Sequence, residues 1–226
     1  MVNLLQAELY KITHTKVMAI CLVFTAGIEF VNSFLHGGNQ IDTMTLLIEI
    51  IGLISCALFS GLSVGIDFSG RTIIHTVTSG KSRNCVWVSK YLSFFMACIV
   101  LLSVNSLAAN AGFLLFHRTG LVFSLTGMTA VVLYTFAGIV YDLCLASLFF
   151  IITMQIKESG ISIAVSTLFV AVMISNSNVL WVDRMFPLLN AQTVMNGIPF
   201  CNFLALLPVP VVVLCAGIQF FKRRDL

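Results

Sequence analysis

Charged residues are scarce in this chain of 226 residues. Only 9% of the residues are Asp, Glu, Lys or Arg, whereas 59% are hydrophobic. Soluble globular domains carry about 25% charged residues, so the composition excludes an ordinary water-soluble enzyme. The net charge of +3 is also too small to indicate nucleic acid as a partner. The class that fits is a membrane protein.

Motifs of metal and nucleotide sites are missing as well. The seven cysteines include no C-x-x-C pair, and we expect most of them to pack as small hydrophobic side chains. No H-E-x-x-H occurs. Gly80-Lys81-Ser82 is similar to the end of a P-loop, but His75 stands where that motif needs its first glycine. We therefore predict no catalytic residue, no metal ligands and no nucleotide site in this chain.

Long apolar runs mark the segments that would cross a membrane. The run from Tyr91 to His117 has no Asp, Glu, Lys or Arg and exceeds the roughly 20 residues that a spanning helix needs. Barrel strands would instead show short alternating patterns. We predict an all-α polytopic membrane protein, a single domain over residues 1–226, with six transmembrane helices at about 17–35, 44–66, 91–116, 129–154, 160–177 and 201–221.

Basic residues are distributed unevenly between the connecting segments. If both termini are cytoplasmic, only Arg118 and Arg184 lie outside. The ten on the cytoplasmic side are Lys11, Lys16, Arg71, Lys81, Arg83, Lys90, Lys157, Lys222, Arg223 and Arg224. This distribution obeys the positive-inside rule. We predict a multi-pass protein of the plasma membrane with both termini in the cytoplasm.

The leader, residues 1–16, has the pattern of a surface helix. One helical face gathers its apolar residues, Val2, Leu5, Leu9 and Ile12. This pattern predicts an interfacial helix on the cytoplasmic side, although a leader that merely orients the first span is an alternative. Glu8 and Lys11 are three residues apart, which is close enough to pair on that helix.

Residues 178–200 form a second segment with an unusual composition. The segment is too apolar for a solvated loop and too interrupted by Asp183, Arg184 and Pro187 to span a membrane. We predict short extracellular helices before the last span, with an ordinary folded loop as the alternative.

Three carboxylates lie inside the expected spans: Glu29, Glu49 and Asp142. A carboxylate in hydrocarbon is costly, so each is expected to face the protein interior or water. Glu29 and Glu49 fall at similar depth and would line one polar patch. The favoured interpretation is structural, with protonation or hydrogen bonds to groups such as Asn32, Asn105 or Asn110, and the alternative is a proton or ion relay.

Gly61 and Gly65 form a G-x-x-x-G spacing in the second expected span. Small residues at this spacing let two helices approach closely. The pattern is common by chance, so it favours helix packing weakly and a dimer seam still more weakly.

The segment from 67 to 90 is short, basic and patterned. Ile73, Ile74 and Val77 stand at helical spacing between Gly70 and Gly80. The pattern predicts one short cytoplasmic helix that ends at Gly80 and presents a small docking surface. A merely basic loop that fixes the orientation is the alternative.

The same segment carries a family resemblance. Asp67 is followed by Gly70-Arg71-Thr72-Ile73, a short apolar stretch, Ser79-Gly80-Lys81-Ser82-Arg83 and Lys90 at the start of the next span. The leader Leu4-Leu5-Gln6-Ala7-Glu8-Leu9-Tyr10-Lys11 and the tail Phe220-Phe221-Lys222-Arg223-Arg224-Asp225 fit the same pattern. Together they resemble the small six-span permeases of bacterial type-2 ABC exporters, a group that includes proteins for antimicrobial-peptide export and immunity.

The resemblance implies a transport subunit without its own ATPase site. Its partners would be a separate nucleotide-binding subunit, which binds ATP and Mg, and a second permease, identical or related, in the lipid bilayer. No cofactor would bind this chain. The leader would be an elbow helix, and a coupling helix would dock on the ATPase through the residues Gly70, Arg71, Ile73, Ile74, Val77, Gly80, Lys81 and Arg83.

The expected function is export of a peptide-like or amphipathic substrate. ATP-driven closure of the partner subunits would push on the segment from Gly70 to Arg83 and shift the spans. The alternative function is a membrane channel outside the ABC class, or a sensor or assembly protein, with the intramembrane carboxylates as its site.

Overall fold

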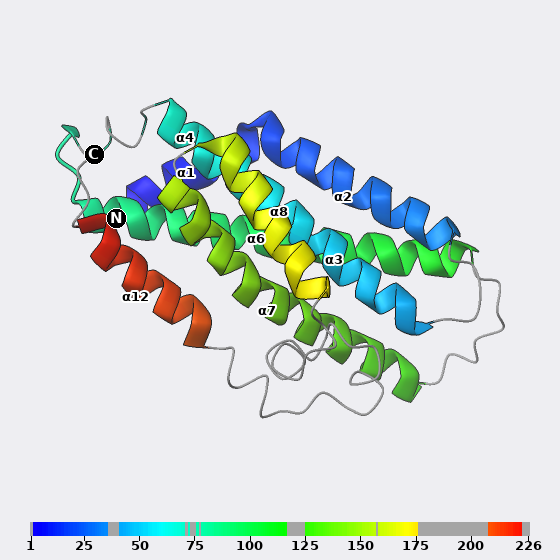
Figure 1. Cartoon of the computed structure of the whole chain (residues 1–226). Helices are drawn as coiled ribbons and strands as arrows, with labels where there is room; N and C mark the ends of the chain where they lie inside the picture. Colours follow the sequence, from blue (N-terminus) through cyan, green and yellow to red (C-terminus); the bar gives the residue numbers. More distant parts are fainter. Residues whose placement is uncertain are drawn as a thin grey trace.

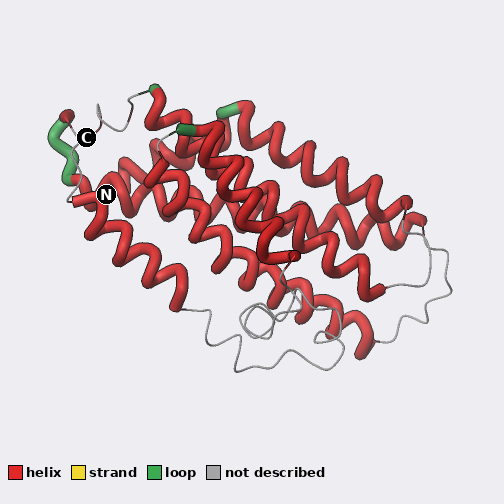
Figure 2. The backbone as a smooth tube through the Cα atoms, viewed as in Figure 1, coloured by secondary structure: helices red, strands yellow, loops and turns green. Residues whose placement is uncertain are grey.

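The computed structural model describes residues 2–35, 41–70, 72, 76, 78–116, 125–156, 158–175 and 208–222. Helices account for nearly all of these residues, and no strand occurs among them (Figure 2). The helices are α1 (Val2–His14), α2 (Lys16–Leu35), α3 (Ile41–Ser60), η1 (Gly61–Gly65), α4 (Ile66–Ser69), α6 (Arg83–Phe116), α7 (Leu125–Ile156), α8 (Ser159–Ser175) and α12 (Pro208–Lys222). The expected all-α class is confirmed for this part of the chain.

Among the described residues, three helical stretches are long and apolar enough to cross a membrane: Ile50–Phe68, Arg83–Gly112 and Gly138–Ile156. The pair α1 and α2 adds a fourth if the two are counted as one bent span, and Ser159–Val172 and Pro208–Gln219 are shorter apolar helices. Each of the six segments expected to span therefore overlaps a helix. The expected extracellular segment 178–200 lies outside the described residues.

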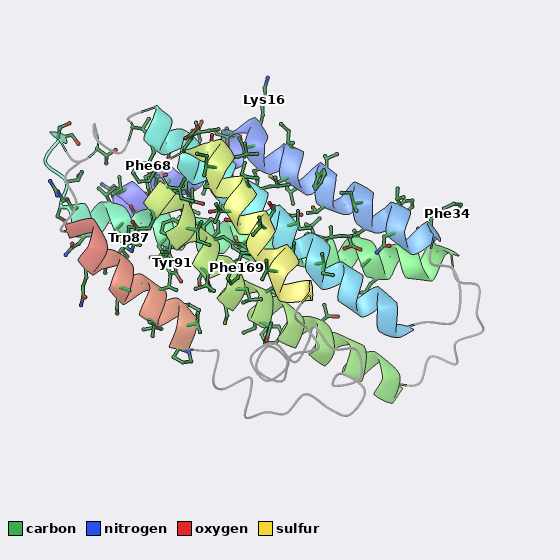
Figure 3. All side chains as sticks on the ribbon, viewed as in Figure 1. Lys16, Phe34, Phe68, Trp87, Tyr91 and Phe169 are labelled. Atoms are coloured by element: carbon green, nitrogen blue, oxygen red, sulfur yellow. The ribbon has the colours of Figure 1, made fainter. Side chains whose placement is uncertain are left out.

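The helix α6 is the centre of the bundle and contacts α1, α2, α3, α7 and α12. Its aromatic side chains build much of the core. The Phe150 ring of α7 packs edge-on against Trp87 and Tyr91, with ring centroids 5.2 and 5.3 Å apart. In Figure 3 both labelled side chains lie on the α12 side of α6, where the Tyr91 hydroxyl donates a hydrogen bond to the Pro210 carbonyl at 3.1 Å.

The helices run back and forth, so the segments with most of the basic residues come together. The helix α1, the start of α2, α4, the start of α6, the end of α7, the start of α8 and the end of α12 all lie at one end of the bundle (Figure 1). This is the end that the sequence predicts to be cytoplasmic, and it is called the basic end below. The segments that were expected to lie on one side of the membrane thus lie at one end of the bundle.

The first two helices meet at a bend of 55°. On α1 the apolar residues Leu5, Leu9 and Ile12 are half-buried, while Gln6 and Tyr10 on the opposite face are exposed. The helical-wheel prediction for the leader is confirmed in this respect. The bend directs α1 across the basic end of the bundle and not along α2.

Toward its second half, the helix α2 has polar side chains on its buried face and several apolar side chains on its outer face. Thr25, Glu29 and Asn32 are buried against the bundle, whereas Val23 and Phe34 are 73% and 62% exposed. In Figure 3 Phe34 and Lys16 mark the two ends of this helix. An apolar outer face is expected of a helix whose outer solvent is lipid, because hydrocarbon does not penalise it.

Candidate functional site

Four charged side chains from three helices meet at the basic end. The Lys90 ammonium group of α6 donates to Glu8 Oε1 of α1 at 2.9 Å and to Asp67 Oδ2 of α4. Lys11 Nζ of α1 donates to the other oxygen of the same aspartate, Asp67 Oδ1. Glu8, Lys11, Asp67 and Lys90 form the charge cluster.

The charge cluster is balanced, with two carboxylates and two ammonium groups. Asp67 and Lys90 are each only 5% exposed, so each depends on its partners. Removing one member of a buried pair costs about 3–5 kcal/mol, because the remaining charge is left without compensation. Lys11 contributes less, because its side chain is 43% exposed and water screens its pair.

No pattern in the sequence brings these four residues together. The spacing of Glu8 and Lys11 would allow them to pair along α1, but in the described structure each contacts a residue of another helix instead. A pair three residues apart contributes only about 0.2–0.5 kcal/mol, whereas a buried lysine must find a carboxylate. One feature of the sequence could have predicted the contact between Asp67 and Lys90. Asp67 ends one apolar run and Lys90 begins the next, and the short segment 67–90 connects the two runs.

The charge cluster is joined directly to the expected coupling segment. The Thr72 hydroxyl donates to the Asp67 carbonyl at 3.0 Å, and the Thr76 hydroxyl donates to the Thr72 carbonyl at 2.8 Å. The backbone N–H of Gly70 donates to the Ile66 carbonyl at 2.8 Å, which closes α4. The cluster therefore lies where the second apolar helix passes into this segment.

The expected coupling residues are described in part. Arg71, Ile73, Ile74 and Val77 lie outside the described residues, while Thr72, Thr76 and Thr78 between them have helical backbone. Gly80 has φ +87°, the left-handed conformation that glycine adopts most easily and that commonly ends a helix. Lys81 is exposed in the turn after it, and Arg83 is half-buried where α6 begins.

A cavity of about 80 Å³ lies beside the charge cluster. Its lining residues are Glu8, Lys11, Ile12, Thr15, Val17, Leu62, Ser63, Val64, Ile66, Asp67, Lys90, Ser93 and Phe94. Pockets for drug-sized ligands have about 300–1,000 Å³, so this cavity has room for a few waters and not for a transported peptide. It lies between α1, η1, α4 and α6.

One wall of the cavity is the π-helical turn η1. Both glycines of the G-x-x-x-G spacing face the start of α8, because a Cβ on Gly65 would lie 2.7 Å from Ser159 Cα and one on Gly61 would meet the Ile163 side chain. The spacing thus serves packing within the chain. Single π-turns inside helices are frequent at functional sites.

The residues of η1 also spell G-x-S-x-G, a pattern of hydrolase nucleophiles, so the expectation that the sequence contains no such pattern was wrong. That motif places its serine on a sharp turn between a strand and a helix. Here Ser63 is inside a helix, and its hydroxyl donates to the Phe59 carbonyl at 2.6 Å. The sequence pattern therefore does not make Ser63 a nucleophile.

The two intramembrane carboxylates whose side chains are described, Glu29 and Asp142, have different surroundings. Glu29 is fully buried in α2, where the amide side chains of Asn32 and Asn105 interact with it electrostatically. Asp142 is 6% exposed in α7, and Cys56 and Cys144 are its electrostatic neighbours. The side chain of Glu49 lies outside the described residues, so the expected patch of Glu29 and Glu49 stays a prediction.

The amide of Asn110, another expected partner of the carboxylates, turns to its own helix. It donates to the Ser106 carbonyl at 2.8 Å. Within the described ranges no group of three or more His, Cys, Asp or Glu side chains is arranged to hold a metal. Four of the six described cysteines, Cys21, Cys56, Cys98 and Cys144, are buried, as expected of small hydrophobic side chains.

Comparison of the sequence with protein-family models and with curated proteins gave no match. The resemblance to type-2 ABC permeases thus rests on the residues quoted above. The structure adds the contacts of Asp67 and Lys90, the two residues that border segment 67–90. The charge cluster is suited to holding helices together. Its four charged groups form ion pairs with one another, and two of them are almost completely buried.

Proposed function

We propose that this chain is the permease subunit of a type-2 ABC exporter. A separate subunit hydrolyses ATP, and this chain, with a second identical or related permease, moves a peptide-like or amphipathic substrate out of the cell. The six apolar segments span the plasma membrane with both termini in the cytoplasm. Support comes from the apolar helices, from the asymmetry of the basic residues and from the family resemblance of segment 67–90.

The observation that carries the proposal is the position of the charge cluster. It joins α1, the proposed elbow helix, to Asp67 and Lys90, the residues that border the proposed coupling segment. A push of the ATPase on the coupling helix would reach α4 through Thr72 and Asp67, and would reach α1 and α6 through the paired charges. The segment is thereby connected to three helices at once, which is what coupling requires.

A second function is kept because of one observation. Glu29 is fully buried in a helix that would face lipid on its other side. A buried intramembrane carboxylate is a functional candidate by default. A membrane channel, or a sensor or assembly protein, would use such residues and would need no ATPase.

The deciding experiment is copurification. A tagged form of this chain, solubilised from its native membranes in mild detergent, should bring down a soluble ATPase with a complete P-loop. Replacing Ile74 or Val77 by Asp would place an unpaired charge in the contact at a cost of several kcal/mol, and should release that ATPase or leave it hydrolysing ATP without transport.

Arg83→Glu is the matched control at the edge of the same segment. Arg83 is half-buried at the first position of α6, so reversing its charge should weaken the association by about 1 kcal/mol and in a salt-dependent way. Retention of the ATPase and of coupled transport by both Asp variants would show that the segment is not the coupling helix. A chain that never copurifies with an ATPase would favour the second function.

A further inference from the structure

Glu29 is a carboxyl group that the described part of the bundle covers completely. Its side chain is 0% exposed, and neither carboxyl oxygen has a hydrogen-bond partner of acceptable geometry among the described residues. Asn32 and Asn105 bear on it electrostatically but do not complete such a bond to it. A charged carboxylate taken out of water in this way is strongly disfavoured relative to the neutral acid.

Among the residues that the structure describes, no cation lies close enough to Glu29 to compensate a negative charge on it. The helices α1, α3 and α6 pack against α2, and α6 has no Asp, Glu, Lys or Arg between Lys90 and Phe116. Lys16, at the other end of α2, lies about 20 Å away along the helix at 1.5 Å per residue. The titratable or charged side chains on these four helices are Glu8, Tyr10, Lys11, His14, Lys16, Cys21, Asp42, Glu49, Cys56, Arg83, Cys85, Lys90, Tyr91 and Cys98.

Those groups fall into two sets. The cations on α1, α2 and α6 lie toward the basic end, in or near the charge cluster, whereas Glu29 lies in the half of α2 nearer Leu35. Asp42 and Glu49 of α3 are acidic, so they would add to the cost of a second negative charge, and their side chains lie outside the described residues. In the described part of the chain, the surroundings of Glu29 thus hold amides and no positive charge.

The buried face of α2 is polar at this level. Thr25 is 0% and Asn32 is 9% exposed on the same face, and Asn105 of α6 is 2% exposed opposite them. The Thr25 hydroxyl donates to the carbonyls of Cys21 and Leu22 in its own helix, so it is not committed to Glu29. If α2 and α6 separated here, water would find a polar surface on both helices.

We propose that Glu29 is a proton-binding site between α2 and α6. In the conformation described here the group is a neutral carboxylic acid. When α2 moves away from α6 and water enters, the O–H bond breaks, the electron pair stays on the carboxylate and the proton passes to water. Closing the interface takes the proton back.

A proton is the ligand that fits this place. A metal cation would need several oxygen ligands around it, and the completely covered carboxyl group has two amides beside it. The proposal concerns the chain itself and does not depend on export, on an ATPase or on the substrate. It holds equally for a permease and for the alternative membrane functions.

Infrared difference spectroscopy tests the protonation directly. Wild type and Glu29→Gln, both reconstituted in lipid vesicles at neutral pH, should differ by the carbonyl stretch of a protonated carboxylic acid, and this band should shift in D₂O. Glu8→Gln is the matched control, because Glu8 accepts from the Lys90 ammonium group and should lose carboxylate bands instead. Carboxylate bands in the Glu29→Gln difference spectrum would overturn the proposal.

Thermal unfolding in detergent gives a second measurement. The folded state favours the neutral acid, so its stabilisation is present at low pH and is lost as the pH rises. The melting temperature of the wild type should therefore fall relative to that of Glu29→Gln as the pH rises above about 4, where a glutamate exposed in the unfolded chain releases its proton while the buried one keeps it. Parallel pH profiles of the two proteins would contradict the proposal, since Gln keeps the shape of the side chain and cannot release a proton.

Discussion

Lys90 and Glu8 are 82 residues apart in the chain, yet Lys90 Nζ lies 2.9 Å from Glu8 Oε1. The same ammonium group also contacts Asp67, whose second oxygen is held by Lys11. One lysine therefore connects the leader helix α1 with α4 and α6. The connection is tight because Lys90 is almost completely buried, so its ammonium group depends on these carboxylates.

A double-mutant cycle measures this connection. Asp67→Asn and Lys90→Met should each destabilise the protein by up to about 3–5 kcal/mol, because each takes one of the two partners from a buried charge and leaves the charge cluster unbalanced. The double variant should be less destabilised than the sum, by about 1–3 kcal/mol, since Glu8 and Lys11 remain and can pair with each other. Thermal unfolding in detergent provides the comparison.

Lys81→Ala is the control for the cycle. Lys81 is exposed in the turn before α6, so its removal should change stability by less than about 0.5 kcal/mol. Strict additivity of Asp67→Asn and Lys90→Met would mean that the two side chains are not coupled.

The close approach of η1 and α8 gives a prediction about Gly65. An added Cβ would lie 2.7 Å from Ser159 Cα, a backbone atom that cannot rotate away. Gly65→Ala should therefore lower the free energy of unfolding by about 1–3 kcal/mol. Gly27→Ala is the matched control, because nothing lies within 4 Å of its added Cβ, and Ala should be neutral or stabilising by up to about 1 kcal/mol. Equal effects of the two changes would disprove the close contact.

The orientation of the chain is tested by cysteine labelling. In a cysteine-free background, single cysteines near Asn39, Gly120 and Asn190 should react with an impermeant thiol reagent from outside intact cells, and one at Ser79 should not. Ser79 is exposed in the structure, so failure to react there would reflect the side of the membrane and not burial. Reaction at Ser79 after permeabilisation is the control, and its reaction in intact cells would reverse the predicted orientation.

Some features of the fold follow from local sequence alone. The helices α2, α3, α6, α7, α8 and α12 occur where long apolar runs were found, because a chain with so few charged residues must satisfy its backbone polar groups internally. The half-burial of Leu5, Leu9 and Ile12 followed from their spacing on one helix, and the left-handed Gly80 followed from its place after a helical pattern.

Other features could not be predicted from the sequence. The pairing of Glu8 and Lys11 with different helices was missed, because a pattern along one helix says nothing about the charges that tertiary packing brings to it. The π-turn at Gly61–Gly65 was not expected either, since it depends on how α8 presses against these glycines.

The sequence by itself determined that this is a helical protein with apolar segments fit for a membrane, and it determined where the basic residues interrupt them. Only the tertiary structure decided which charged side chains form ion pairs and which carboxyl group is buried without a hydrogen bond to its oxygens. Hydrophobic periodicity is a property of neighbouring residues along a helix, whereas the contact of Lys90 with Glu8 and the isolation of Glu29 depend on which helices pack together.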